Sequence, residues 1–110
     1  MSRRREYAPW FDADIQLRSA WYTNKGGPAL AIRFIDALEA TVDNLELNPS
    51  RGRKPFPRDP QLTDLHAILL ERPFQRLILF YRFTDEALTL ERLIHGARDL
   101  PQRIRESPAE

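Results

Sequence analysis

The chain contains no cysteine and only two histidines, His66 and His95, among its 110 residues. The absence of cysteine excludes disulfide bonds and thiolate metal ligands, and it suits the reducing interior of a cell. Two isolated histidines without a helical pair make a poor metal site. We therefore expect no metal, no cofactor and a cytoplasmic location.

Long apolar runs are also missing. The longest run, LILFY at residues 77–81, is far shorter than the ~20 residues that a membrane-spanning helix requires. At the N-terminus MSRRRE supplies basic residues, but YAPWFDADIQ then interrupts the apolar core that a signal peptide needs. The Gly26-Gly27 pair stands alone, without the pattern of a nucleotide-binding loop. We expect no membrane segment, no export signal and no nucleotide site.

What the chain does contain is arginine. Lys25 and Lys54 are the only lysines, so 15 of the 17 basic residues are arginine, although the net charge is only +1. The planar guanidinium matches phosphate and carboxylate oxygens in pairs, which indicates an anionic partner. A coding sequence rich in G and C gives the same enrichment without any functional cause. The length suits one domain, residues 1–110.

Two helices are predicted in the first half of the chain. Asp12 is the expected N-cap of the first, which should end near Asn24. The GGP at 26–28 predicts a tight turn into the second, which the Asn48-Pro49 pair should end. The outer face of the second helix is mainly acidic and should be solvated. The residues at helical spacing are Trp10, Ala13, Leu17, Ala20 and Trp21 in the first helix, and Ala31, Phe34, Ile35, Leu38, Val42 and Leu45 in the second.

The second half of the chain predicts a loop and three strands. NPSRGRKPFPRDPQ, with four prolines, should form no regular element. The runs HAILLER, QRLILFYRF and ALTLERLIH follow at short intervals, which predicts an antiparallel meander. The fold class is therefore α+β, a helical hairpin packed on a small antiparallel sheet in the order β-α-α-β-β-β. DLPQRI should add a short C-terminal helical turn capped by Asp99.

The strand pattern places several arginines unusually. In the middle run one face is the core face, and the other should border a cleft where arginine heads extend beside apolar groups. In the last run Arg92 falls among leucines, which indicates a bulge or a functional break. His95 ends that run, and one interpretation is a half-buried ring bonded to a backbone carbonyl. The two faces of the middle run are Leu77, Leu79, Tyr81 and Phe83 against Arg76, Ile78, Phe80 and Arg82.

In this order of elements the chain resembles the RelE/ParE superfamily of bacterial toxins, and its ParE-like plasmid-stabilisation branch in particular. The resemblance rests on WYTNKGGPALAIRF, NPSRGR and RLILFYRFTDEALTLERLIHGARDLP, and it covers roughly Tyr7 to Ile104. It implies the toxin of a type II toxin-antitoxin pair, neutralised by a ParD-like antitoxin with a ribbon-helix-helix start and a disordered tail. The expected assembly is a toxin-antitoxin hetero-oligomer.

Two mechanisms occur within the superfamily. ParE-like members poison DNA gyrase without hydrolysis, and RelE-like members cleave messenger RNA on the ribosome. RNA cleavage needs a base, an acid and cationic donors. The resemblance offers His95, Arg76, Arg82 and Tyr81 for these roles, but Gly96 stands where the nucleases place a tyrosine, and no glutamate lies between residues 48 and 70. We expect gyrase inhibition, with mRNA cleavage as one alternative and a nontoxic binding module as another.

The resemblance also suggests which residues contact the target and the antitoxin. For the target we expect Arg76, Arg82 and Arg98 to face one shared concavity, and for the antitoxin we expect an apolar edge together with the basic face of the sheet. The expected target-binding residues are Arg76, Arg82, Arg92, His95 and Arg98, and the expected antitoxin-binding residues are Trp10, Trp21, Tyr22, Arg76 and Arg82.

Overall fold

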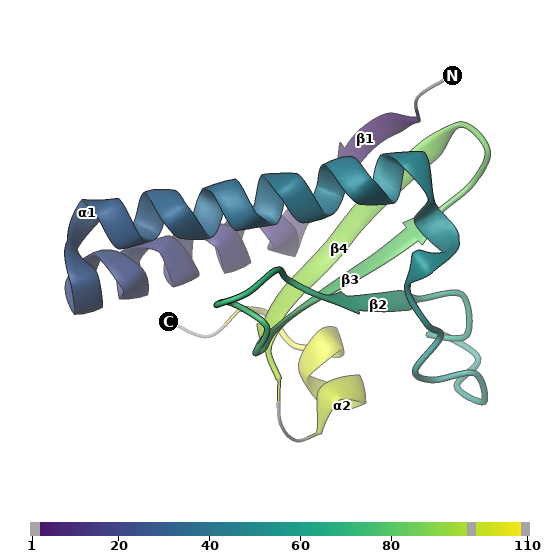
Figure 1. The fold of residues 1–110 in the computed structure, drawn as a ribbon. Helices are drawn as coiled ribbons and strands as arrows, with labels where there is room; N and C mark the ends of the chain where they lie inside the picture. The colour runs from purple at the N-terminus through teal and green to yellow at the C-terminus, as the bar shows by residue number, and fades with distance from the viewer. Residues whose placement is uncertain (1–2, 97–98, 109–110) are drawn as a thin grey trace.

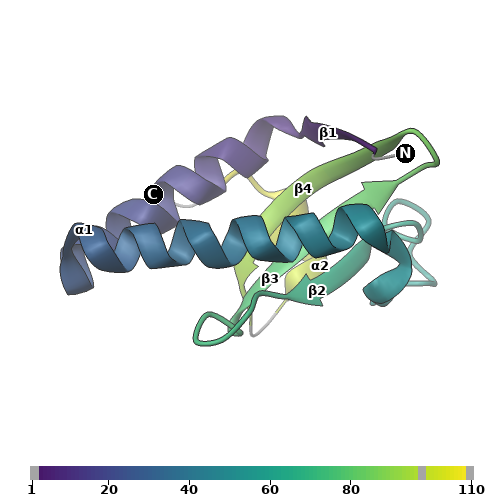
Figure 2. The same cartoon turned by 45° about the horizontal axis from the view of Figure 1, so that its top comes forward.

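The computed structural model describes residues 3–96 and 99–108. A helical hairpin covers one face of a four-stranded sheet, and a short C-terminal helix lies against the other face (Figures 1 and 2). Across these residues no helix is both long and apolar enough to cross a membrane. The elements are β1 (Arg4–Tyr7), α1 (Pro9–Leu47), a 3-10 turn (Pro49–Arg51), β2 (His66–Leu69), β3 (Leu77–Phe83), β4 (Ala87–His95) and α2 (Leu100–Arg105).

The predicted hairpin is confirmed as two arms of α1 that meet at a sharp kink. Gly27 interrupts the helix with a φ of 83° and a ψ of 176°, a conformation that glycine adopts at little cost. Pro28 then begins the second arm, as its fixed φ favours. The predicted N-cap at Asp12 is wrong by four residues, because Ala8 is the N-cap and Pro9 occupies the first turn. The two arms run back along each other in Figure 1.

The second arm buries the apolar face that its sequence predicts, whereas the first arm buries a different face from the predicted one. In the second arm Phe34, Leu38, Val42 and Leu45 are buried, as the spacing predicts. The first arm instead turns Phe11 inward, together with the buried Asp14 and the half-buried Ile15 and Tyr22. The residues that the sequence placed on one stripe remain outside: Trp10 is 40%, Leu17 36% and Trp21 47% exposed.

The sheet has the order β1-β4-β3-β2 and is mixed rather than antiparallel throughout. Strands β2, β3 and β4 form the predicted meander. Strand β1 pairs in parallel with β4, from Arg4 opposite Ala87 to Tyr7 opposite Leu90. Parallel pairing needs a long crossover between strands, and the helical hairpin with the meander after it returns the chain in the same direction. The purely antiparallel prediction is therefore wrong at this one edge.

A β-bulge accounts for the irregular pattern of β4. Phe80 pairs with Arg92 and Tyr81 pairs with Leu90, which leaves Glu91 without a partner in the ladder. The extra residue reverses the alternation of side chains. Leu90 and Leu93 both join the core under the hairpin. Arg92 instead lies opposite Phe80, on the second face of the sheet. The predicted bulge is confirmed.

Each face of the sheet has its own core. The larger core lies under the hairpin and includes Leu79, Tyr81 and Leu90. The prediction of an open, arginine-lined cleft on the second face is wrong at the centre of β3, because Phe80 is fully buried there. The loop after α1 and the helix α2 cover this face. The smaller core consists of Leu62, Leu65, Ala67, Phe80, Ile94 and Ile104.

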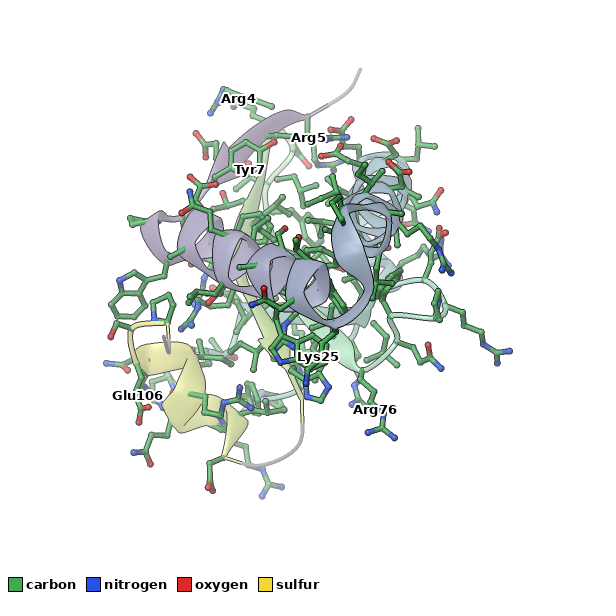
Figure 3. All side chains as sticks on the ribbon, turned by 90° about the vertical axis from the view of Figure 1, so that its left-hand side faces the viewer. Arg4, Arg5, Tyr7, Lys25, Arg76 and Glu106 are labelled. Atoms are coloured by element: carbon green, nitrogen blue, oxygen red, sulfur yellow. The ribbon has the colours of Figure 1, made fainter. Side chains whose placement is uncertain are left out.

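The acidic face of the second arm binds an arginine of the first strand and is not only solvated. Arg5 of β1 reaches across and donates hydrogen bonds to the carboxylates of Glu39, Asp43 and Glu46. Burial alone lowers the pKa of Arg5, and the hydrogen bonds with the three carboxylates outweigh it and raise the pKa. The first strand is thereby tied to the hairpin (Figure 3).

The loop at residues 48–61, which we call the basic loop, is held against the sheet by a buried tyrosine. The Tyr81 hydroxyl donates to the carbonyl of Pro49 at 2.7 Å and accepts from the amide of Gly52 at 2.9 Å. The backbones of Arg53 and Ala67 form a further bridge. A Cβ atom on Gly52 would lie 2.3 Å from the Tyr81 hydroxyl oxygen and 2.7 Å from the Ala67 carbonyl oxygen. The loop is therefore fixed in position at its start.

Replacing Gly52 with alanine is expected to lower the free energy of unfolding by about 1–3 kcal/mol, because the added methyl group forces this loop off the sheet. Urea denaturation measures the change. Gly26→Ala is the matched control, since the atoms nearest to its new Cβ all belong to the side chain of Leu30 and none is a backbone atom or a hydrogen-bonding group. Equal stability of Gly52→Ala and wild type would contradict the tyrosine contact.

Candidate binding cleft at the end of β4

A cleft of about 300 Å³ opens where the first arm of α1, the end of β4 and the helix α2 meet. It lies at the HGARD segment that the sequence singles out, of which Ala97 and Arg98 are outside the described residues. Figure 3 views this end of the molecule, with Glu106 beside α2 and Arg76 projecting into solvent on another side. The lining residues are Asp14, Leu17, Arg18, Trp21, Arg92, Leu93, Ile94, His95, Arg103, Glu106 and Ser107.

Arg92 and Asp14 form the floor of the cleft. Arg92 is 6% exposed, and its Nε and Nη2 donate to the Asp14 carboxylate at 2.8 and 3.0 Å. The Leu93 amide donates to the same carboxylate at 2.9 Å. The remaining nitrogen of Arg92 donates to the carbonyl oxygens of Arg103, Ile104 and Glu106 at the end of α2. All three nitrogens of the Arg92 guanidinium therefore donate hydrogen bonds to groups inside the protein.

This arrangement corrects the expected role of Arg92 as a target-binding residue. A guanidinium that is buried and fully paired cannot reach an external partner without breaking the fold. The structure instead makes Arg92 the group that joins β4, the first arm of α1 and α2. Local pattern singled out Arg92 but could not show its pairing with Asp14, because the two are 78 residues apart and an aspartate off the apolar stripe is usually solvated.

His95 occupies the inner end of the cleft and is half-buried. Its carbonyl oxygen accepts a hydrogen bond from Nη1 of Arg103 at 2.8 Å. Burial lowers the pKa of His95, and the positive charges of Arg18, Arg76 and Arg103 lower it further. The surroundings of His95 therefore favour its neutral form, and three arginines contribute to this. Neither Arg18 nor Arg103 is among the predicted contact residues, although the spacing of Arg18 and Trp21 is that of neighbours on a helix.

Trp21 forms the outer wall of the cleft between two cations. The guanidinium carbon of Arg18 lies 5.2 Å and the ammonium of Lys25 lies 5.5 Å from the indole. Together with Leu17 and Trp10, it leaves a row of large apolar side chains on the surface. We call Trp10, Leu17 and Trp21 the tryptophan strip. Tyr22, which the sequence analysis placed beside them, instead packs half-buried against the core.

Arg82 in β3 and Arg76, just before that strand, do not share a concavity. Arg82 donates to the Gln61 carbonyl at 2.9 Å and lies 3.6 Å from the Glu91 carboxylate. Arg76 precedes the other end of the strand and is exposed. Six residues of strand separate the two by about 20 Å. The predicted common site is therefore wrong for Arg76 and Arg82, and Arg98 lies outside the described residues.

Tyr81 does not line the cleft at the end of β4. It is fully buried, and burial raises the pKa of its hydroxyl. Both of its hydrogen bonds go to the loop after α1, as described above. Of the four residues offered for RNA cleavage, only His95 and Arg76 therefore lie at the same end of the sheet.

The C-terminal turn agrees with its prediction in position but not in detail. Asp99 is the N-cap of α2, with a φ of 53°, yet its side chain makes no capping hydrogen bond. Elsewhere on the surface, a second hollow of about 370 Å³ lies between the basic loop and β2. It is bordered by Arg51 and Arg53, and both arginines are exposed.

A helical hairpin over a mixed sheet, with exposed tryptophans and arginines beside a small cleft, defines an α+β domain with a surface of the protein-binding type. The family described as "ParE toxin of type II toxin-antitoxin system, parDE" matches residues 6–100. The chain belongs to this ParE toxin family, and the resemblance inferred from its motifs is confirmed.

The comparison with solved structures agrees at the level of the fold. A chain of the "Chromosomal ParDE TA system from P. aeruginosa" superposes with a TM-score of 0.69 at 16% sequence identity. The match covers 87% of the present chain and 98% of the other. No curated protein matches the sequence.

Proposed function

We propose that residues 1–110 form one toxin domain that acts in the cytoplasm by binding DNA gyrase and blocking replication, without hydrolytic chemistry. A ParD-like antitoxin holds the toxin inactive. The observation that supports this mechanism is the dispersal of the candidate catalytic residues, because Tyr81 is buried in the core and Arg82 lies about 20 Å along the strand from Arg76.

The exposed groups suit a mechanism based on binding alone. Tryptophan and arginine contribute most often to the energy of protein interfaces. The tryptophan strip and its neighbouring cations present both kinds of side chain on one side of the first arm. We propose that the antitoxin covers Trp10 and Trp21, with a smaller contribution from Tyr22. His95 and Arg76 remain proposed target contacts, and Arg82 remains a proposed contact at the other end of β3.

Messenger RNA cleavage is the second candidate because the surroundings of His95 favour its neutral form, which can accept a proton. Such a reaction also needs an acid for the leaving oxygen and donors for the developing phosphorane charge at hydrogen-bond distance. The Tyr81 hydroxyl donates to the Pro49 carbonyl within the core, so it is not available as that acid. We therefore favour gyrase as the target.

Tightly controlled expression in a bacterial host tests the proposal. We expect growth to stop, and incorporation of labelled thymidine to fall before that of labelled methionine, because a gyrase poison blocks DNA synthesis first. A ribosomal nuclease gives the opposite order. His95→Gln should abolish toxicity if the histidine is a catalytic base and should change it less if it is one contact among several. Unhindered growth at confirmed expression would contradict a toxin and favour a nontoxic binding module.

A further inference from the structure

The cleft contains positive charge that the protein itself does not neutralise. Of its three arginines, Arg92 is neutralised by Asp14. Arg103 donates only to the neutral carbonyl of His95, and Arg18 lies over an indole. Within residues 3–96 and 99–108, neither Arg18 nor Arg103 forms an ion pair.

Among the residues that the structure describes, Glu106 is the one other carboxylate that lines the cleft. Glu106 is exposed, and its side chain accepts a hydrogen bond from Gln102 at 2.9 Å. Two uncommitted guanidinium groups therefore face one rim carboxylate and the half-buried imidazole of His95. A guanidinium has five N–H donors, so Arg103 retains donors after its bond to the backbone. The site can accept a negatively charged oxygen ligand.

The walls between these cations are apolar. Leu17, Trp21, Leu93 and Ile94 line the cleft, and its volume is about 300 Å³. This space accommodates one or two side chains and not a folded nucleic-acid segment. Apolar walls and the carboxylate of Glu106 also disfavour a chain of phosphates, whose charge is high and whose hydration is costly to remove. A single carboxylate on an apolar stem fits both the charges and the walls.

We propose that this cleft binds one acidic side chain of the antitoxin, with its carboxylate between Arg18, His95 and Arg103 and an adjoining apolar side chain against Trp21. The cleft is continuous with the tryptophan strip, because Leu17 and Trp21 belong to both. The inference rests on the proposed neutralisation by a ParD-like antitoxin. It also explains inhibition, since the antitoxin then covers His95, a proposed target contact.

Binding of a carboxylate should be visible in the titration of His95. The charged groups that face this ring are Arg18, Arg76 and Arg103 on the positive side, with Glu106 at the rim and Asp14 committed to Arg92. In the free chain burial and the arginines keep the pKa of His95 below its usual value of 6.5. A bound carboxylate opposes the effect of the arginines and raises that pKa again. Affinity should therefore increase as the pH falls through the pKa of His95 in the complex.

The chain is well suited to this measurement because it has only two histidines. The imidazole proton resonances of His95 are titrated by NMR in the free chain and in the toxin-antitoxin complex, and His66→Gln assigns them. We expect the pKa of His95 to be higher in the complex than in the free chain. A pKa of His95 that is unchanged or lower in the complex overturns the proposal.

Affinity measurements give an independent test. Arg18→Gln and Arg103→Gln should each weaken antitoxin binding about tenfold or more, as expected for the loss of a hydrogen bond between charged groups. Arg33→Gln, an exposed change on the second arm, is the matched control and should leave affinity unchanged. Since Arg103→Gln also loses the bond to the His95 carbonyl, Arg18→Gln is the deciding variant. Equal affinities of Arg18→Gln and Arg33→Gln overturn the proposal.

A nucleic-acid ligand is the competing outcome. A short single-stranded oligonucleotide is titrated into the free chain while Trp21 fluorescence is followed in a Trp10→Phe background. Quenching that disappears in Arg18→Gln overturns the proposal in favour of a phosphate site. A nontoxic chain that binds antitoxin with the expected dependence on Arg18 rejects the proposed function and supports the cleft. A toxic chain whose affinity for the antitoxin does not depend on Arg18 supports the proposed function and rejects the cleft as the carboxylate site.

Discussion

Replacing Arg92 with alanine is expected to reduce the free energy of unfolding by about 3–5 kcal/mol, the range found when one partner of a buried ion pair is removed. The Asp14 carboxylate would keep only the Leu93 amide as a donor in its buried position. The carbonyls of Arg103, Ile104 and Glu106 would lose their shared donor as well. Urea denaturation measures the loss.

The control for this change is Arg105→Ala. Arg105 and Asp59 form an exposed ion pair, and exposed pairs contribute about 0–1 kcal/mol. A double-mutant cycle with Asp14→Asn separates the pairwise term from the lost packing of the arginine stem. If Arg92→Ala costs no more than Arg105→Ala, then Arg92 does not hold the three elements together, and its place among the target contacts is open again. Faster proteolytic release of α2 is the expected companion result.

The second large effect is expected for Phe80→Ala, at about 3–5 kcal/mol for a large buried aromatic side chain. Phe80 is fully buried and stacks with Phe56 at a centroid distance of 6.4 Å. Its loss opens the small core that holds both α2 and the basic loop. Because whole domains are stable by only about 5–15 kcal/mol, the variant should be close to unfolding at 37 °C. Thermal and urea denaturation measure the shift.

Arg82→Ala is the matched comparison because it lies on the same face of the same strand. Its guanidinium is partly exposed and its ion pair with Glu91 spans 3.6 Å, so its loss should cost less than about 1 kcal/mol. Similar losses for the two variants would mean that the second face of β3 is not a packed core. The pair therefore tests whether this face is structural at its centre and solvated at its end.

Local chemical signals were sufficient for most of the fold. The GGP turn predicts the hairpin because only glycine tolerates the backbone angle found at Gly27. The bulge in β4 was visible as one arginine that broke the alternation of apolar residues. The parallel pairing of β1 had no such signal, since the strand is four residues long and mostly exposed. Its partner lies more than 80 residues away in the chain.

The candidate site was less predictable, and the reason is long-range packing. Alternation placed Phe80 and Arg82 on one face correctly, but it could not show that α2 covers the first and leaves the second in solvent. His95 was found because it ends a strand beside a glycine. Arg18 and Arg103 approach it only after the hairpin and α2 have packed on β4. No local pattern in the sequence indicates that Asp14 accepts hydrogen bonds from Arg92.

The placement of the two chain ends matters for anyone who prepares this protein. Residue Ser107 is part of the cleft wall, so an affinity tag fused at the C-terminus would follow the chain close to this cleft. The amide of Arg4 donates to the Glu86 carbonyl at 2.9 Å, which sets the other end beside the turn that begins β4. A tag there departs from the far end of that strand (Figure 1). Binding assays should therefore use N-terminal fusions.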